Sequence, residues 1–454
     1  MGGGLLQLVA YGAQDAYITG NPHITFWKVL YKRHTNFAME AMRVNFTGAP
    51  AWGQRVVAVV NRNADLIGKT YVEIVLPDMV TPNPDIVWSS GVQRRIGYAM
   101  LKQIEVEIGG QVIDRHYGEW LYLWETLTAD FNTAYKLDTL VGGSLGGTST
   151  SALACQGRPN VLYVPLQFWF NRNPGLALPL IALQYHEVRI NIILGDATDL
   201  VSTTNFPAGI NAAAAALPQV RDMALYFDYI YLDVDERRRF AQESHEYLID
   251  QLQYEGQQQI ITASARLDLT LNHPVKELIW VFQDARYADC ASIGVTDPNT
   301  GNASAYTMPF TYSDVINRCR LQLNGQDRFD ERYGDYFWKV QPYQHHTAGG
   351  INPNFGIQSA IVDTTDTSAR DAVVQGRANP INVYSFAIQP EEHQPSGTCN
   401  FSRIDNATLV FDSKTDGLPG TFPSKAYPYN FRLYAVNYNI FRIMSGMGGL
   451  AYSN

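Results

Sequence analysis

The residues of this chain that could do chemistry stand in a few short motifs, and one of them looks like the setting of a nucleophilic serine. Gly142-Gly143-Ser144-Leu145-Gly146 has the Gly-x-Ser-x-Gly pattern that holds a serine on a sharp turn between a strand and a helix. Here the residues on both sides are rich in Gly, Ser and Thr, which predicts loop instead of strand and helix. We therefore interpret the match as coincidental and predict no catalytic residue there.

A second glycine motif, Gly446-Met447-Gly448-Gly449-Leu450-Ala451, resembles the fingerprint of a dinucleotide-binding turn. That fingerprint needs a following helix whose N-terminus faces the pyrophosphate. The sequence stops at Asn454, so we predict a flexible tail and no cofactor.

Histidines are the candidate ligands for a metal site, chiefly His345, His346 and His393. A β-rich metal enzyme usually draws a His-x-His or His-x-Asp pair from one face of a strand and a third ligand from elsewhere. Adjacent residues of an extended strand point to opposite faces, so His345 and His346 do not fit. We predict surface histidines and no metal site. His186, within an apolar stretch, is predicted to be buried with a backbone partner.

Paired carboxylates are the last candidates for catalysis. Glu105 and Glu107 share one face of a predicted strand. A glycosidase needs two carboxyl groups on facing elements, one on each side of the sugar bond. Two carboxylates on one hairpin are therefore predicted to be solvated. Because no catalytic arrangement remains, we predict that the protein is not an enzyme.

Composition narrows the class further. The net charge is −9 and the sequence has no long basic run, which argues against direct binding of nucleic acid. The cluster Arg237-Arg238-Arg239 stands beside acidic residues and is predicted to be a solvated linker. The four cysteines are far apart and are predicted to be ordinary thiols. A signal peptide and a long apolar span are both missing from the pattern, so we expect a protein kept in a reducing compartment.

The elements that would position these residues are dominated by one hairpin that occurs twice. Ile104, Val106 and Ile108 alternate with glutamates, and Cys319, Leu321 and Leu323 alternate with polar residues. This is the period of a half-buried strand. Each run ends in a pair that accepts positive φ at both positions, and the sequence therefore predicts type I′ turns. These predicted turn residues are Gly109, Gly110, Asn324 and Gly325.

Other landmarks recur in the same order, which indicates a duplicated domain. Tyr117-Gly118-Glu119-Trp120 aligns with Tyr333-Gly334-Asp335-Tyr336, and a short helix is predicted to include Trp120, Trp124 and Leu127. Later matches pair Tyr163 with Tyr384, Pro174 with Pro395, Val188–Ile190 with Thr408–Val410, and Leu225-Tyr226 with Leu433-Tyr434. Short strands separated by turns and long loops predict two β-sandwiches or barrels. The predicted division is an N-terminal arm at 1–23, a first domain at 24–235 and a second at 236–454.

Several longer segments carry a resemblance to a known family. They are Leu6–Asp15, Gly20–Pro22, Thr35–Ala38, Pro174–Val188, Leu323–Phe329, Gln394–Leu409 and Arg442–Tyr452. Together they resemble the major capsid proteins of nucleocytoplasmic large double-stranded DNA viruses, with the phycodnavirus (chlorovirus-like) branch the most similar. The resemblance covers nearly the whole chain and departs in loops near 77–95, 131–160, 284–312 and 345–380.

That resemblance implies an all-β fold of two consecutive eight-stranded jelly rolls with short helices in the loops. It implies a homotrimer that forms a pseudo-hexagonal capsomer of an icosahedral virion. The implied partners are neighbouring capsomers, minor capsid proteins and a penton protein, with possible indirect contact to an internal viral membrane. Synthesis and assembly are expected in the host cytoplasm.

The family supplies no catalytic residue. It also transfers no glycosylation site, so use of the sequons at Asn45, Asn302, Asn400 and Asn406 stays unknown. The alternative function is a glycan-binding or receptor-attachment module on the same jelly rolls.

Overall fold

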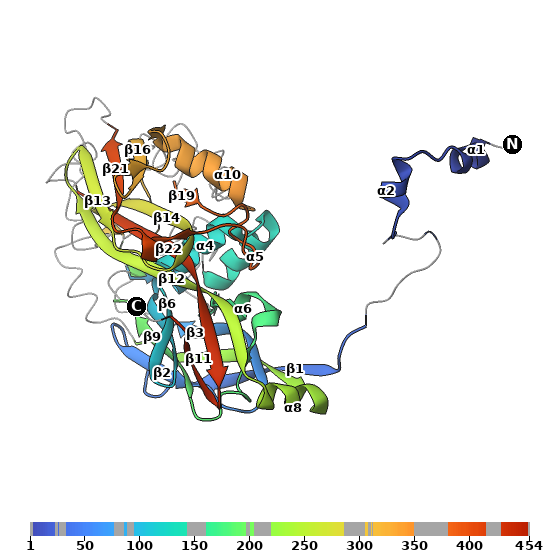
Figure 1. Ribbon diagram of the computed structural model, residues 1–454. Coiled ribbons are helices and arrows are strands. Elements are labelled where there is room, and N and C mark those ends of the chain that lie inside the picture. The colour runs from blue at the N-terminus through green and yellow to red at the C-terminus, as the bar shows by residue number, and fades with distance from the viewer. Residues whose placement is uncertain are drawn as a thin grey trace. The chain divides into compact units, whose positions relative to one another are not determined.

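Strands arranged in paired antiparallel sheets dominate the chain in a computed structural model. The structure describes residues 3–22, 26, 33–76, 86–88, 95–142, 160–196, 200–203, 219–285, 305–306, 310, 312–348, 380–414 and 428–452. The chain divides into two units, Met1–Phe37 and Ala38–Asn454. The larger unit holds the second predicted domain and the first from residue 38 onward (Figure 1).

The first half of the large unit consists of two antiparallel sheets of four principal strands each. One sheet has the order β1 (Phe37–Asn45), β11 (Asp222–Leu232), β3 (Leu66–Leu76) and β7 (Asn160–Pro165), and β8 (Leu178–Pro179) also pairs with β3. The other has the order β2 (Arg55–Val59), β9 (Val188–Leu194), β5 (Leu101–Ile108) and β6 (Gln111–His116). This connectivity is that of a jelly roll, and we call this half the first roll.

The second half repeats the same strand orders. Its first sheet is β12 (His245–Ile260), β22 (Tyr429–Met444), β14 (Pro274–Asp284) and β19 (Asn382–Ser385), with β20 (Cys399–Asn400) on β14 and β23 (Met447–Leu450) on β22. Its second sheet is β13 (Ser264–Leu269), β21 (Ala407–Ser413), β16 (Ile316–Leu323) and β17 (Gln326–Asp327), with β18 (Arg332–Tyr333) also on β16. The predicted double jelly roll is confirmed, and we call this half the second roll.

Short elements lie between the strands of the two rolls. A small sheet of β4 (Ile86–Trp88), β10 (Val201–Thr203) and β15 (Ala305–Tyr306) joins loops from both halves. Within the described residues of the large unit the helices are α3 (Ile96–Ala99), α4 (Gly118–Thr128), α5 (Phe131–Val141), α6 (Trp169–Arg172), η1 (Pro174–Leu176), α8 (Val234–Gln242), the π-helix η4 (Tyr336–Val340), α10 (Gln341–His345) and η6 (Phe401–Arg403). The helix expected around Trp120 and Trp124 is α4, and it is buried along most of its length.

The strands form because apolar side chains recur at every second position and meet in two cores. In β3 the residues Val72, Ile74 and Leu76 are buried while those between them are half-exposed. The second roll has its own core, which includes Trp280, Phe282 and Leu433. The core of the first roll also takes in residues from the second, such as Tyr434 and Val436. The two rolls therefore share buried apolar surface.

Two expectations about glycine segments need correction. The segment expected to be a flexible tail is instead β23, which pairs with β22 through the turn at Ser445 and Gly446, both with positive φ. The Gly-x-Ser-x-Gly motif follows α5, which ends at Val141, so a helix precedes it where loop was predicted. Ser144 lies outside the described residues.

The linker between the rolls is a helix whose residues are all accessible to solvent. Asp233 caps α8 by accepting from the backbone N–H of Val234 at 2.8 Å. Arg237 Nε lies 3.0 Å from Asp65 Oδ1 of the first roll, so one guanidinium of the basic cluster is tied down. The cluster is solvated as predicted, but in a helix.

The described residues of the N-terminal unit include two short helices, α1 (Gly3–Val9) and α2 (Asp15–Thr19). Neither helix has a buried residue, and Leu8, Tyr17 and Ile18 are each more than three-quarters exposed. Within the described part of the chain, no helix combines the length and the apolar character needed to span a membrane.

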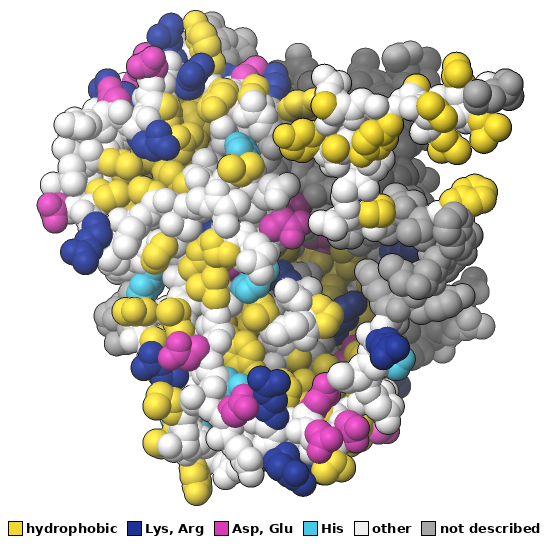
Figure 2. Space-filling model, turned by 45° about the vertical axis from the view of Figure 1, so that its right-hand side comes forward, with side chains coloured by type: hydrophobic (Ala, Val, Ile, Leu, Met, Phe, Trp, Pro, Cys, Tyr) yellow, Lys and Arg dark blue, Asp and Glu magenta, His cyan; other side chains and the backbone are white. Residues whose placement is uncertain are grey.

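Charges of both signs are mixed on one face of the molecule. On the face shown in Figure 2, Lys and Arg side chains stand singly or beside Asp and Glu, without forming one continuous stripe. This distribution matches the balanced composition of the sequence and differs from the basic stripe of a nucleic-acid-binding face.

Candidate assembly interface

The four predicted turn residues occupy equivalent places in the two rolls. Gly109 (φ 60°) and Gly110 (φ 83°) connect β5 to β6, and Asn324 (φ 50°) and Gly325 (φ 78°) connect β16 to β17. Positive φ at both central positions is what a type I′ turn requires. The residues that flank the turns pair directly, Ile108 with Gln111 and Leu323 with Gln326.

A backbone hydrogen bond also links each turn to the residue just before the neighbouring strand of the same sheet. The Gly109 N–H donates to the Glu187 carbonyl at 3.0 Å, and the Asn324 N–H donates to the Asn406 carbonyl at 2.7 Å. Both acceptors stand at or just before the start of equivalent strands, β9 and β21. The turns therefore fix the register of the same four-stranded sheet in each roll.

A second pair of glycines, Gly118 and Gly334, lies at the start of the helical segment that follows each hairpin. A Cβ on Gly118 would overlap the carbonyl oxygens of Tyr98 and Leu101, and a Cβ on Gly334 would overlap that of Ile316. Leu101 and Ile316 are the first residues of the equivalent strands β5 and β16. Gly118 and Gly334, which align in the sequence, therefore make the same close contact with the backbone in the two rolls.

The segment after Gly118 forms the contact between the two rolls. Glu119, near the start of α4, receives both arms of the Arg432 guanidinium from β22, with Nε–Oε2 and Nη2–Oε1 distances of 2.6 Å. The Tyr434 hydroxyl donates to the same carboxylate at 2.5 Å. Such a bidentate geometry is the strongest and most directional form of carboxylate pairing.

Electrostatics keep this contact charged. Burial alone would lower the pKa of Arg432, but the attraction of Glu119 outweighs it and leaves the pKa above its usual value. Burial, together with the charge of Glu119, raises the pKa of the Tyr434 hydroxyl well above its usual value, so it stays a donor. The carboxylate and guanidinium join residues 313 positions apart, and the network extends further, because the Tyr312 hydroxyl also donates to Glu119 and Arg432 also donates to Gln283.

Aromatic rings surround this ion pair. Tyr117 lies 4.7 Å from Tyr254, Tyr254 lies 4.9 Å from Tyr434, and Trp120 lies 5.7 Å from Tyr434, all between ring centroids. Offset and tilted ring pairs at such distances add stabilisation beyond the area that they bury. Figure 1 shows α4 beside β22, where these residues meet.

A second charged contact between the rolls is centred on a fully buried lysine. Lys276 Nζ on β14 lies 3.4 Å from both carboxylate oxygens of Asp250 on β12. Arg172 of the first roll reaches the same carboxylate at 3.5 Å and stacks on the Trp124 ring at 4.7 Å. Burial lowers the pKa of Lys276, and Asp250 opposes that shift. The Asp250 carboxylate therefore pairs with a cation from each roll, Lys276 from the second and Arg172 from the first.

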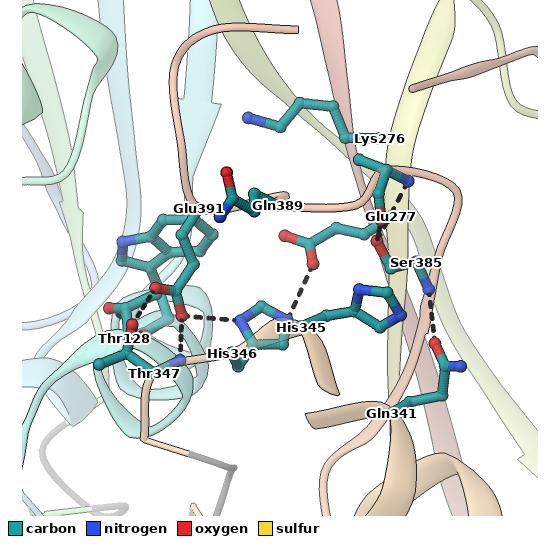
Figure 3. Close-up of polar contacts among 12 residues, drawn as sticks. Thr128, Lys276, Glu277, Gln341, His345, His346, Thr347, Ser385, Gln389 and Glu391 are labelled. Atoms are coloured by element: carbon teal, nitrogen blue, oxygen red, sulfur yellow. Dashed lines mark hydrogen bonds and ion pairs between the residues drawn. The ribbon is translucent and has the colours of Figure 1, made fainter. Parts of the chain in front are cut away.

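His346 corrects the expectation of a surface histidine. Its side chain is fully buried, with Nε2 3.0 Å from Glu277 Oε2 and Nδ1 3.0 Å from Glu391 Oε1 (Figure 3). Thr347 donates to Glu391 through both its backbone N–H and its hydroxyl. The Ala348 N–H, next in the chain, donates to the Leu127 carbonyl of α4 at 3.0 Å. This segment thus also joins the second roll to the first.

A carboxylate on each side of the ring favours the charged form of His346, with a proton on both nitrogens. Burial by itself lowers the pKa of His346, but Glu277 and Glu391 together raise it to about 9. The prediction failed because it assumed an extended chain, whereas α10 ends at His345 and turns its neighbour inward. His345 is partly exposed, and its Nδ1 contacts the Ile388 carbonyl.

The carboxylates expected to be solvated are partly buried instead. Glu105 is only 7% exposed and accepts from Arg115 Nε at 2.8 Å, while Arg55 lies 3.6 Å away. Glu107 accepts from the Asn191 amide on β9 at 2.9 Å. The face of β5 that seemed free is covered by side chains from β2, β6 and β9, which one strand's pattern does not indicate.

The remaining candidates behave as structural groups. His186 is half-buried and its Nδ1 contacts the Gly448 carbonyl at 2.9 Å, a backbone partner as predicted. Cys319 is buried and Cys399 half-buried, both as free thiols, and burial raises the pKa of Cys319. Cys155 and Cys290 lie outside the described residues. Among the residues that the structure describes, no cluster of His, Cys, Asp and Glu is suited to hold a metal ion.

Family models match nearly the whole chain. Residues 25–233 match the N-terminal part of the major capsid protein, and residues 236–358 and 371–449 match the large eukaryotic DNA virus major capsid protein. The major capsid protein of Pyramimonas orientalis virus is 46% identical over 460 residues and covers 100% of both chains. That of Paramecium bursaria Chlorella virus 1 is 39% identical over 488 residues, again with full coverage of both. The resemblance drawn from the sequence is confirmed.

Solved structures agree with these relatives. The quasi-atomic model of the PBCV-1 virus capsid superimposes with a TM-score of 0.73 at 35% identity, covering 95% of this chain and 100% of that one. The Faustovirus major capsid protein gives a TM-score of 0.66 at 12% identity, covering 96% and 94%, and supports the fold alone. The chain therefore belongs to the family of large eukaryotic DNA virus major capsid proteins.

Proposed function

We propose that three copies of this protein form a pseudo-hexagonal capsomer, and that many such capsomers tile the icosahedral shell of a large DNA virus. The observation that carries the proposal is the repetition of one strand order in two rolls joined by a buried interface. A trimer of double rolls presents six similar sides, so hexagonal packing is reached with three chains. Family membership supports the capsid role, and the names of the relatives favour it over a glycan-binding module.

We assign separate roles to the three predicted parts of the chain. The arm is residues 1–23, the first roll 24–235 and the second roll 236–454. The two family models meet between residues 233 and 236, at the start of α8 (Val234–Gln242), which supports the second limit. The rolls serve as rigid blocks, while loops and the arm contact other chains.

The proposed partners are neighbouring capsomers, minor capsid proteins and a penton protein, with indirect contact to an internal membrane. No direct contact with nucleic acid is proposed, in keeping with the net charge of −9. The proposed place of assembly is the host cytoplasm.

The oligomeric state tests the proposal directly. Light scattering on the purified protein should give three times the chain mass of 50.8 kDa, and negative-stain images should show particles with six-sided outlines. A monomer at micromolar concentration would overturn the proposal.

The arm gives a separate test of how the work is divided. Deleting residues 2–20 should leave the trimer folded, because neither α1 nor α2 has a buried residue, and should impair shell assembly. Unfolding of the trimer on this deletion would show instead that the arm belongs to the core.

A further inference from the structure

The contact between the rolls within one chain has two sides. One side is the covered helix end, Tyr117, Glu119 and Trp120 of the first roll. The other is the covered sheet face, Ile279, Val281, Arg432 and Tyr434 of the second roll. Ile279 and Val281 are fully buried and Tyr434 is 2% exposed. These residues point away from the second roll's own core, which Trp280 and Leu433 enter from the same strands.

Strand register identifies the same sheet face in the first roll. Tyr434 pairs with Ile279 and Arg432 with Val281, while Tyr226 pairs with Tyr71 and Ala224 with Glu73. Leu225 enters the core of the first roll as Leu433 enters that of the second. Tyr226 and Tyr71 are therefore the counterparts of Tyr434 and Ile279. We call the outer residues Tyr71, Glu73, Tyr163 and Tyr226 the open sheet face.

The helix end has a counterpart as well. Tyr333, Asp335 and Tyr336 match Tyr117, Glu119 and Trp120 across the shared glycine, and we call them the open helix end. Tyr333 is 62% exposed, whereas Tyr117 is half-buried against the second roll. Asp335 is half-exposed and pairs with Lys339 at 2.7 Å within its own helical segment.

Each chain thus has one open sheet face and one open helix end. Its covered sheet face and covered helix end already contact each other within the chain. The open sheet face is rich in tyrosine, with Tyr71 stacked on Tyr226 at 5.1 Å and edge-on to Tyr163 at 5.9 Å. All of its members are half-buried. The counterparts of Tyr71, Glu73 and Tyr226 on the second roll, which are Ile279, Val281 and Tyr434, are fully covered. Clustered tyrosines that are only partly covered are typical of the centres of protein interfaces.

The two open surfaces lie at opposite ends of the large unit. In Figure 1, α10 and the segment before it lie at one end of this unit, and β3 and β11 lie at the other. A chain cannot bring its own open surfaces together across that separation. A second copy can bring its open helix end to the open sheet face of the first, in a head-to-tail contact that either closes into a ring or continues as a filament.

We propose that the open helix end of each copy covers the open sheet face of the next, and so repeats between chains the contact made within each chain. This inference rests on the proposed function, because closure after three copies is what that function supplies. Asp335 then takes the place of Glu119 and accepts from the Tyr226 hydroxyl. Since Ala224 stands where the second roll has Arg432, the contact between chains has no counterpart of the bidentate ion pair. Aromatic stacking and the Asp335–Tyr226 hydrogen bond hold it instead.

Cross-linking between two singly substituted chains tests the contact. One chain carries Tyr226→Cys and the other Asp335→Cys; they are mixed, unfolded, refolded together and treated with a short bis-maleimide. We expect a cross-linked dimer in the mixture. A mixture of Asp335→Cys with Val59→Cys is the control, since Val59 is exposed on β2 in the other sheet of the first roll.

The doubly substituted chain gives the closure test. With both cysteines in each copy, the cross-linked ladder should stop at three. Cross-linking of Tyr226→Cys with itself would indicate a symmetric dimer contact and would overturn the proposal.

A charge substitution gives a second readout that does not depend on cysteines. Tyr226→Asp faces Asp335 of the next copy and should raise the concentration of half-dissociation at least tenfold by mass photometry. Adding Asp335→Lys to the same chain should recover most of that loss, whereas Val59→Asp should leave the value unchanged.

The outcomes separate this inference from the proposed function. If the unmodified protein is a trimer but neither the cross-link nor the effect of Tyr226→Asp is seen, the contact is wrong and the trimer stands. If the unmodified protein is a monomer, both are overturned.

Discussion

In β22 of the second roll, four successive residues from Leu433 to Val436 are all buried, whereas in its counterpart β11 only alternate residues after Leu225 are. The two strands occupy the same place in sheets of the same order. The residues that face their own cores are equally buried. The difference lies on the outer face, which the first roll covers in β22, whereas Tyr226, Asp228 and Ile230 on the outer face of β11 are only half-buried.

This comparison separates what folds a roll from what joins one roll to another. Core-facing residues and turns set the sheet order, so they can be similar in both halves. The outer faces have diverged: Arg432 and Ile279 in the second roll correspond to Ala224 and Tyr71 in the first. A permanently buried contact tolerates apolar residues and a closed ion pair, while a face that stays in water before assembly favours tyrosine.

Removal of Arg432 should be the most damaging change to the covered face. Arg432→Ala leaves the Glu119 carboxylate, whose side chain is 12% exposed, without its charge partner. Breaking a buried ion pair from one side typically costs about 3–5 kcal/mol. We expect a clear fall in the thermal unfolding midpoint.

Arg442 provides a matched control on the same strand. It pairs with Glu246 at 2.7 Å, but the two side chains are 48% and 57% exposed. Arg442→Ala should therefore cost less than about 1 kcal/mol. Equal effects of the two substitutions would contradict the view that the covered face acts as a core.

His346 should give the next largest effect and a distinct dependence on pH. His346→Gln removes the positive charge between Glu277 and Glu391 but can still donate one hydrogen bond, so we expect a loss of about 2–3 kcal/mol. His345→Gln, at the partly exposed neighbouring position, is the control and should change little.

The sign of the pH effect follows from the raised pKa of His346. Because the folded pKa of about 9 exceeds the ordinary value of 6.5, the stabilisation is complete below about pH 6.5 and is lost as the pH rises through 9. The unmodified protein should lose stability over that window in denaturant titrations. The His346→Gln variant should show a flatter profile there, and an unchanged slope would argue against a charged ring.

Gly118 and Gly334 offer a test in which the two rolls should behave alike. Alanine at either position places a methyl group on a backbone carbonyl of β5 or β16, which side-chain movement cannot relieve. Overpacking of this kind costs about 1–3 kcal/mol or more. Circular dichroism melts of Gly118→Ala and Gly334→Ala should fall by similar amounts. A large effect in one roll only would show that the duplication does not extend to this contact.

The sequence predicted the features that local pattern controls. Period-two alternation found β5 and β16, and pairs that accept positive φ found the turns after them. Spacing alone could not find the Glu119–Arg432 contact, because its partners are 313 residues apart and neither stands in a distinctive local pattern. The only available hint was the alignment of Glu119 with Asp335, which marks an acidic residue at one place in both rolls.

The burial of His346 and Glu105 was mispredicted for one physical reason. Local periodicity tells which side of an element a residue occupies, but not whether another element covers that side. His346 follows the end of α10 and enters the space between β14 and the segment at Glu391. Glu105 lies under arginines from neighbouring strands. Tertiary packing, which one strand's pattern does not encode, decided both.

The turns that first revealed the duplication give the smallest expected effects and the finest comparison. At the second position of each turn, Gly110 and Gly325, a Cβ would meet open space, so Gly→Ala costs only the positive φ, about 1 kcal/mol in both rolls. At the first position the rolls differ, because Asn324 already carries a side chain while a Cβ on Gly109 would overlap the His186 ring.

Gly109→Asn should therefore destabilise more than Asn324→Gly, which loses only the hydrogen bond that Asn324 Oδ1 accepts from the Asn406 N–H. Melting both variants beside Gly110→Ala would show whether His186, which reaches from this turn to Gly448 of the second roll, makes the first turn part of the contact between the rolls. Equal losses of thermal stability in Gly109→Asn and Asn324→Gly would mean that each turn stabilises only its own roll.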